Sequence, residues 1–180
     1  MSIYQDLMSS DYIELAKNFR VNPEHCDNPE HYQNYIWQDS VTDQKQGMGV
    51  THVFVDENEE TKEKKIAGYI TLRNSSLIMD IGESYKLGYP ALEISELAVD
   101  YNYERQNLGT DMVKFAIGEA ARLNENMVGI QYVVLCADPK AVGFYSNRKL
   151  NFQKVPTYKQ IPREQRNKDC TPMVLKVAES

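Results

Sequence analysis

The segment from residue 92 to residue 137 constrains the fold more than any other part of the chain. The apolar, strand-like run LEISELAV is followed by a polar stretch, by apolar residues at helical spacing, and then by the nearly continuous apolar run VGIQYVVLCA. The helical pattern consists of Met112, Val113, Phe115, Ala116, Ala120 and Leu123. Because parallel strands need a crossover connection, usually a helix, this order predicts a β–α–β unit with parallel strands at 92–99 and 128–137.

The sequence on either side predicts short helices and antiparallel strands. One helix is expected from Ser10-Asp11 to Phe19, and a second opens at Asn28-Pro29, where Asn caps and Pro takes the first helical position. A third helix opens in the same way at Asp138-Pro139. Strands are expected at 51–55 and 66–72, joined as a hairpin, and at 152–155 and 173–177. The stretch 75–91, which contains Gly82, Gly88 and Pro90, is predicted to be a loop.

The length and charge of the chain limit its class. With 180 residues, of which 42% are hydrophobic, the chain suits one domain, 1–180, with a real core. The 20 basic and 26 acidic side chains give a net charge of −6, which does not indicate a nucleic-acid binder. The charge is uneven, however: residues 1–100 carry 8 basic and 18 acidic groups, a net −10, and residues 101–180 carry 12 and 8, a net +4. The second half can therefore attract an anion.

The cysteines are widely spaced, and the chain has no long apolar run. Cys26, Cys136 and Cys170 form no CxxC pair and have no histidine at metal-ligand spacing, so we expect reduced thiols and no metal. No run approaches the roughly 20 apolar residues of a membrane span, and the N-terminus lacks a basic segment followed by an apolar one. The expected location is the cytoplasm.

The polar loop after residue 99 and the segment 137–152 carry a resemblance to a known family. The loop YERQNLGT ends at a helix N-terminus, where unpaired N–H groups favour an anion. It resembles the Q/R-x-x-G-x-G/A pyrophosphate motif of the GNAT superfamily of acetyl-CoA-dependent N-acetyltransferases, with Gly109 kept, Glu104 in place of Gln or Arg, and Asn107 in place of the first glycine. Asn tolerates positive φ better than most residues, so the loop shape can survive.

The second segment, ADPKAVGFYSNRKLNF, is similar to another GNAT pattern. Asp138, Ala141, Tyr145 and Phe152 fall in register with it, and Asn151 replaces the usual glycine. The resemblance implies a single α/β (α+β) domain with a mixed, mostly antiparallel sheet of six to seven strands flanked by helices. It also implies a splay between the strands at 92–99 and 128–137.

The resemblance implies direct attack by an amine on the thioester of acetyl-CoA, with a base for the amine and an acid for the leaving thiolate. Tyr145 is the candidate acid, and its competing interpretation is a core aromatic beside Phe144. Glu93 and Glu96 are the candidate bases; they point to opposite faces of one strand, so at most one faces the acceptor. We slightly prefer Glu93, and either can instead be a structural carboxylate. The three histidines, His25, His31 and His52, form no recognisable triad or metal set.

Acetyl-CoA is the implied co-substrate, and no metal is expected. Main-chain groups of the strand would bind the pantetheine arm, those of the loop would surround the pyrophosphate, and Asp138 would lie near the cofactor. The binding residues implied by the resemblance are Leu97, Ala98, Val99, Arg105, Gln106, Asn107, Leu108, Gly109, Thr110 and Asp138. The loops at 20–50 and 75–91, the first carrying Tyr32, Tyr35 and Trp37, are expected to shape the acceptor pocket.

The acceptor itself stays open. The acidic first half favours a cationic small molecule or a protein amine, attracted before it loses its proton. Phe19 and the runs HYQNYI, GVTHVFV and IAGYITL also resemble acetyltransferase toxins of toxin–antitoxin pairs, which acetylate aminoacyl-tRNA, although Glu96 stands where those toxins often have Arg. A third alternative is an acetyl-CoA-binding protein without activity, because the cofactor loop is altered. No membrane partner is expected, tRNA is a partner only under the toxin alternative, and the family resemblance allows a homodimer.

Overall fold

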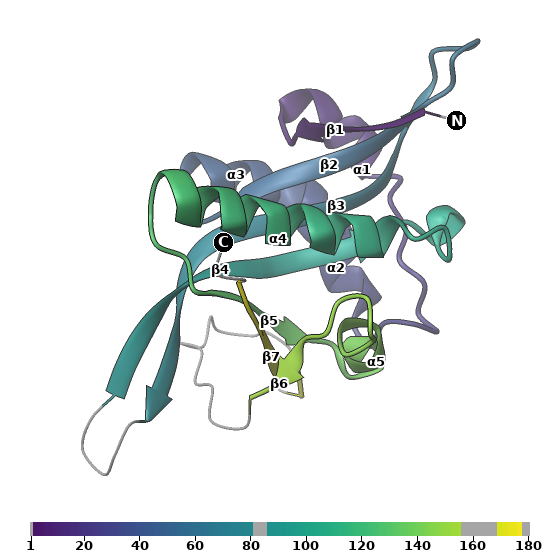
Figure 1. The fold of residues 1–180 in the computed structure, drawn as a ribbon. Coiled ribbons are helices and arrows are strands. Elements are labelled where there is room, and N and C mark those ends of the chain that lie inside the picture. The colour runs from purple at the N-terminus through teal and green to yellow at the C-terminus, as the bar shows by residue number, and fades with distance from the viewer. Residues whose placement is uncertain (1, 81–85, 156–168, 178–180) are drawn as a thin grey trace. The chain divides into compact units, whose positions relative to one another are not determined.

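A computed structural model describes residues 2–80, 86–155 and 169–177. Seven strands form a mixed sheet in the order β1-β2-β3-β4-β5-β7-β6. Their bounds are β1 Ser2–Leu7, β2 Val50–Glu57, β3 Lys64–Asp80, β4 Lys86–Val99, β5 Tyr132–Ala137, β6 Gln153–Lys154 and β7 Thr171–Lys176. The α-helices are α1 Ile13–Ala16, α2 Pro29–Gln38, α3 Ser40–Lys45, α4 Leu108–Asn126 and α5 Val142–Tyr145, and the 3₁₀ turns are η1 Ser10–Tyr12, η2 Tyr101–Tyr103 and η3 Pro139–Ala141. Figure 1 labels the helices and strands along the chain.

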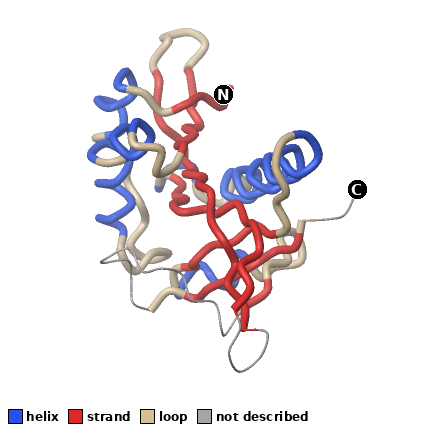
Figure 2. The backbone as a smooth tube through the Cα atoms, turned by 90° about the vertical axis from the view of Figure 1, so that its left-hand side faces the viewer, coloured by secondary structure: helices blue, strands red, loops and turns tan. Residues whose placement is uncertain are grey.

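The chain divides into two compact units, and the first contains residues 1–73 and 95–112. In this unit β1 pairs antiparallel with β2, and β2 pairs antiparallel with β3, as the predicted hairpin requires. The helices α1, α2 and α3 lie together along one side of these strands (Figure 2). The buried side chains between helices and strands form one core, made of Met8, Tyr12, Ala16, Phe19, Tyr35, Ile36, Val53, Val55, Ile66, Tyr69 and Ala98.

A bulge in β3 helps to fix the end of β4. Phe54 pairs with Gly68 and Val55 with Ile66, which leaves Ala67 as an extra residue on β3. The Ala67 carbonyl accepts a hydrogen bond from the N–H of Asp100 (2.9 Å), the first residue after β4. The irregularity in the hairpin therefore holds the start of the loop that follows β4.

The second unit contains residues 74–94 and 113–180. In it β4 and β5 pair in parallel from Ala91↔Tyr132 to Ile94↔Leu135, which confirms the predicted crossover. The ladder ends there, as the predicted splay requires, while β4 continues to Val99. β7 pairs antiparallel with β5 on one side and with β6 on the other.

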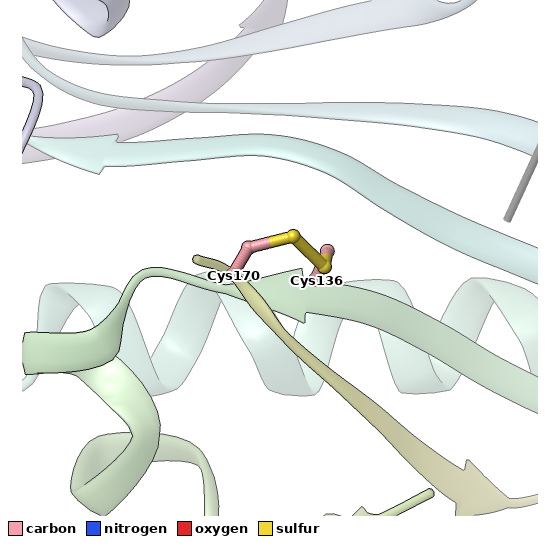
Figure 3. Close-up of a disulfide and its surroundings, with 2 residues drawn as sticks. All are labelled: Cys136 and Cys170. Carbon is pink, nitrogen blue, oxygen red and sulfur yellow. A yellow bond between two sulfur atoms is a disulfide. The ribbon is translucent and has the colours of Figure 1, made fainter. Parts of the chain in front are cut away.

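A disulfide in this second unit overturns the expectation of reduced thiols. Cys136 and Cys170 are bonded, with their Cα atoms 5.4 Å apart (Figure 3). The bond joins the end of β5 to the residue before β7, where Cys136 lies opposite Pro172 in the ladder. The two cysteines are 34 residues apart in sequence, and only the β5–β7 pairing brings them together. Cys26 is free and buried.

Several predicted elements differ in extent from the observed ones. The stretch 75–91 was predicted as a loop, but β3 extends to Asp80 and β4 begins at Lys86; Gly82 lies outside the described residues. Glycine and proline, normally turn formers, stand here at Gly88 and Pro90 inside β4. The expected helix at 10–19 is a 3₁₀ turn followed by one turn of α-helix, capped by Ser9. The strand β1 and the helix α3 had no clear pattern in the sequence.

The described helices include none that is long and apolar enough to cross a membrane.

Candidate functional site

The loop after β4 is anchored by a buried carboxylate in the first unit. Asp100 is 5% exposed. Its Oδ2 accepts a hydrogen bond from the Arg20 N–H (2.8 Å), and its Oδ1 accepts from the N–H and the side-chain amide of Asn102 (3.0 and 2.9 Å). In addition, the Tyr101 N–H donates to the Arg20 carbonyl (2.8 Å). One side chain thus caps η2 and ties the loop to the segment after α1.

The next two residues of the loop are held by other distant segments. The Tyr103 hydroxyl donates to Asp56 Oδ2 on β2 (2.8 Å). Glu104 Oε2 lies 2.9 Å from His25 Nδ1 and accepts from the Asn22 amide at 3.1 Å. Glu104, which replaces the family's Gln or Arg, is therefore engaged with the N-terminal segment.

Two residues without glycine's freedom adopt left-handed conformations just before α4. Arg105 has φ 61° and Asn107 has φ 65°. This confirms that Asn107 takes the conformation of the glycine that the motif usually has there. The α4 helix begins at the next residue, Leu108, with the Asp111 N–H donating to the Asn107 carbonyl (3.0 Å). A turn of this kind at a helix N-terminus presents N–H groups to an anion, which fits a pyrophosphate.

The strand segment just before the loop is packed closely against its neighbours. Ala98 is buried, whereas Leu97 and Val99 are half-buried. A Cβ on Gly68 would lie 3.1 Å from the Ala98 carbonyl oxygen and 3.1 Å from Met112 Cε, so the absent side chain lets β3, β4 and the first turns of α4 approach. This segment is the one expected to offer main-chain groups to pantetheine.

A carboxylate–imidazole pair lies directly before that segment. Glu96 on β4 has only 3% of its side chain exposed, and its Oε2 is 3.0 Å from His31 Nε2 on α2. The His31 side chain is 37% exposed. The carboxylate of Glu96 is thus buried, and the imidazole bonded to it is partly exposed to solvent.

Aromatic rings surround this pair. The His31 ring packs edge-on against Tyr32, with 5.1 Å between centroids, and lies 6.3 Å from Tyr35, which in turn stacks on Tyr69. Burial raises the pKa of Tyr35 to about 12, and burial and the charge of Glu96 raise the pKa of Tyr69 well above its usual value. Both phenols stay protonated at neutral pH. Tyr35 belongs to the core of this unit, and the partly buried Trp37 packs against that core. Both therefore lie on a packed helix and not on the open loop that the sequence suggested.

Three of the sequence-predicted residues belong to the second unit. Glu93 is 2% exposed and pairs with Val134 in the β4–β5 ladder. Asp138 is 7% exposed, and its side chain caps η3 by accepting from the Lys140 N–H (3.0 Å). Tyr145 ends α5, is 7% exposed and contacts Phe144 and Phe152 edge-on. The alternatives for Tyr145, acid or core aromatic, both remain compatible with this position.

The structure reveals two histidine contacts that the sequence reasoning missed. His31 meets Glu96 across 65 residues, and His25 meets Glu104 across 79. No residue spacing could have indicated either, because each joins the α1–α2 region to the β4–loop region. In the described part of the chain, no group of three or more His, Cys, Asp or Glu side chains is arranged to hold a metal ion.

The model of the acetyltransferase (GNAT) family matches residues 9–152. The chain belongs to the GNAT family. As a GNAT member it is an acetyltransferase, and acetyl-CoA is its donor. A comparison with curated proteins finds no match.

Solved structures share the fold of this GNAT protein from end to end. A tyrosine-to-phenylalanine mutant of KacT has a TM-score of 0.74 at 16% identity, covering 98% of this chain and 96% of that one. AtaT complexed with acetyl-methionyl-tRNAfMet has 0.72 at 16%, covering 97% and 95%. A mutant of the toxin AtaT, bound to the C-terminus of the antitoxin AtaR and acetyl-CoA, has 0.67 at 15%, covering 98% and 94%. At such identities the likeness establishes the fold.

Proposed function

We propose that this GNAT protein transfers the acetyl group of acetyl-CoA to the amine of an aminoacyl-tRNA. The observation that carries the proposal is a basic run in the last third of the chain. Residues 140–168 contain eight Lys or Arg and one Glu, a net +7. The cofactor loop and α4 do not account for the positive charge, since residues 101–139 carry three basic and five acidic groups, a net −2. A positive run of this density suits a polyanion much larger than acetyl-CoA.

The described part of the basic run is accessible. Lys140, Arg148, Lys149 and Lys154 are all exposed. Each lies in the second unit, on or beside η3, α5 and β6. The fold likeness to AtaT, a toxin solved with acetyl-methionyl-tRNAfMet, supports the same acceptor class. The acidic first hundred residues, which favoured a cationic small molecule, would repel a nucleic acid, so the proposal places the tRNA contacts on the basic run.

The chemistry assigned to the candidate residues is direct acyl transfer. The amine, once neutral, attacks the thioester carbonyl, and a C–N bond forms. The C–S bond then breaks, and the leaving thiolate takes a proton from the Tyr145 hydroxyl, which recovers one from the nitrogen. The turn at Arg105 and Asn107 would hold the pyrophosphate, and the main chain of 97–99 would align the pantetheine arm.

Charge-reversal variants test the acceptor. Arg148→Glu with Lys149→Glu is expected to lower kcat/KM for methionyl-tRNA about tenfold or more at low salt. The slope of log kcat/KM against log salt concentration should become less negative by about two. Acetyl-CoA affinity should be retained. Lys114→Glu, an exposed change of the same sign on α4, is the control and should alter kcat/KM by less than about threefold. Equal losses in both proteins, or faster turnover of a small polyamine than of methionyl-tRNA, would contradict the proposal.

Tyr145→Phe separates an enzyme from an acetyl-CoA-binding protein. The ring and its contacts with Phe144 and Phe152 are kept, so acetyl-CoA should still raise the melting temperature. The rate of acetyl transfer should fall about 100-fold. If the parent protein transfers no acetyl group to any amine while acetyl-CoA still stabilises it, the protein binds the donor without catalysis.

A further inference from the structure

We propose that His31 and Glu96 act as a dyad, in which His31 removes the proton of the acceptor amine and Glu96 holds and balances the imidazole. The inference rests on the proposed acetyl transfer and names the base within it. Sequence reasoning placed the base on Glu93 or Glu96 alone. The dyad instead combines a residue of α2 with one of β4, both in the first unit.

The difference in exposure assigns the two roles. Glu96 has 3% of its side chain exposed and His31 has 37%, with 3.0 Å between Oε2 and Nε2. An acceptor can therefore touch the imidazole, whereas the carboxylate is covered. With the carboxylate beside Nε2, the imidazole is held in the orientation and tautomer that leave Nδ1 as the basic nitrogen. His31 is the catalytic residue of the pair, and Glu96 is its positioning residue.

Both partners are fixed by the fold. The Tyr69 hydroxyl donates to the Tyr32 carbonyl (2.8 Å), which ties the first turn of α2 to β3 beside the dyad. The Asn28 side chain caps α2 by accepting from the N–H of His31 itself (3.4 Å). On β4, Glu96 immediately precedes 97–99, the segment proposed for pantetheine. Glu96, to which His31 is hydrogen-bonded, is therefore adjacent in sequence to that segment.

The other ionisable groups near Glu96 do not compete for the proton. Tyr35 on α2 and Tyr69 on β3 face it, and burial raises the pKa of each, to about 12 for Tyr35 and well above its usual value for Tyr69. Asp43 of α3 lies beside Tyr35, with its Oδ2 at 3.4 Å from the phenol oxygen. Tyr32 and Cys26 are further ionisable groups near Tyr69. The two phenols stay neutral in the range where an imidazole changes its charge.

The proton that the acceptor loses is released to the solvent. The ammonium form of the acceptor gives one proton to His31, which passes it to water. The neutral amine attacks the carbonyl carbon, the nitrogen loses a second proton, and the departing thiolate gains one. Amide, CoA thiol and one released proton are the products.

The pH dependence of kcat tests the dyad in the full-length protein. With saturating methionyl-tRNA, the parent kcat should rise with pH and level off once the imidazole is neutral. His31→Gln should lower kcat about 100-fold at neutral pH, with little change in KM, and its kcat should keep rising beyond the pH at which the parent levels off, until the amine itself is neutral. His52→Gln is the matched control, since that histidine lies on β2 and bonds to Gln5 (2.8 Å), and it should leave the profile unchanged. An unaltered plateau in His31→Gln would overturn the proposal.

Glu96→Gln distinguishes the dyad from a carboxylate base acting alone. It keeps the size and a hydrogen bond to His31 but removes the charge that favours imidazolium, so the rising limb should move to lower pH by about one unit or more. Complete loss of activity in Glu96→Gln, with normal turnover in His31→Gln, would assign the base to Glu96 and overturn the dyad.

The coupling can also be measured without turnover. In an NMR titration, the midpoint of the His31 imidazole should move to lower pH in Glu96→Gln, while that of His52 stays in place. An unmoved His31 midpoint would overturn the dyad whatever the acceptor is. If the midpoint moves but the protein does not acetylate methionyl-tRNA, the His31–Glu96 pairing is supported and the proposed acceptor is wrong.

Discussion

At the scale of single residues, two asparagines take over the conformations of glycines. Asn107 has φ 65° before α4, and Asn151 has φ 55° before β6, each where the GNAT pattern usually has glycine. Their tolerance of positive φ was predictable from residue type. The left-handed conformation of Arg105 was not predictable, because nothing in an arginine side chain favours it.

Asn107→Val tests the loop conformation. A β-branched residue at positive φ costs about 1–2 kcal/mol or forces the turn to change, so acetyl-CoA affinity should fall about tenfold or more. Asn107→Gly is the control and should bind within about threefold of the parent, as measured by calorimetry. Equal affinities for the Val and Gly variants would show that the turn does not hold the donor.

Tyr103 makes the stability of the fold sensitive to alkali. Burial, and then the hydrogen bond to Asp56, raise the pKa of Tyr103 from 10 to about 12. The unfolded chain ionises this phenol first, so its contribution is complete below pH 10 and disappears between pH 10 and about 12. Chemical denaturation of Tyr103→Phe should show a shallower loss of stability across that interval than the parent does. An identical slope would mean that Tyr103 ionises freely in the native state.

At the scale of elements, the loop after β4 is held by segments remote in sequence. The β3 bulge, the segment around Arg20 and Asn22, and Asp56 of β2 each bond to a residue between 100 and 104. The turn proposed for the pyrophosphate therefore depends on the packing of the first unit.

Asp100→Ala tests this anchoring. It removes the acceptor for three N–H donors, and hydrogen bonds to a charged group contribute about 1.5–3 kcal/mol each at most, with partial compensation by water. We expect a loss of about 2–4 kcal/mol in the free energy of unfolding and weaker acetyl-CoA binding. Asp11→Ala, an exposed change, should cost less than about 0.5 kcal/mol in the same urea titration. A change as small as that of the control would refute the anchoring role.

The elements also show where sequence reasoning succeeded. The β4–α4–β5 unit, the β2–β3 hairpin and the Asn28 and Asp138 caps have local patterns, and all were predicted. The extension of β3 and β4 was not predicted, because Gly82, Gly88 and Pro90 are typical of a loop. The strand β1 was not predicted, because its own residues have no clear strand pattern and it is defined by its pairing with β2. The His31–Glu96 pair and the disulfide depend on contacts between distant segments, which a single sequence does not encode locally. Of the candidate site, the left-handed conformation of Asn107 was predictable, whereas His31, the partner of Glu96, was missed.

At the scale of the molecule, charge and covalent cross-linking both distinguish the last third of the chain. The net +7 run at 140–168 begins soon after Cys136 and ends just before Cys170. The disulfide thus closes a loop that contains the entire basic run. We expect the bond to stabilise this part of the chain and the surface that it carries.

Cys136→Ser with Cys170→Ser tests that contribution. For a loop of this length, removal of the cross-link is expected to lower the free energy of unfolding by about 2–4 kcal/mol. Reductant should lower the melting temperature of the parent and leave that of the double variant unchanged. Cys26→Ser, at the free buried cysteine, is the control for reductant and should respond as the parent does. A parent insensitive to reductant would contradict a stabilising bond.

The acetyl acceptor is the central claim, and the product of a single incubation tests it most directly. The purified protein is mixed with acetyl-CoA, methionyl-tRNA and an equal concentration of a polyamine, and the released methionine and the polyamine are analysed by mass spectrometry. The account predicts N-acetyl-methionine as the main product, with its formation abolished by prior deacylation of the tRNA. Acetylated polyamine beside unmodified methionyl-tRNA would contradict it.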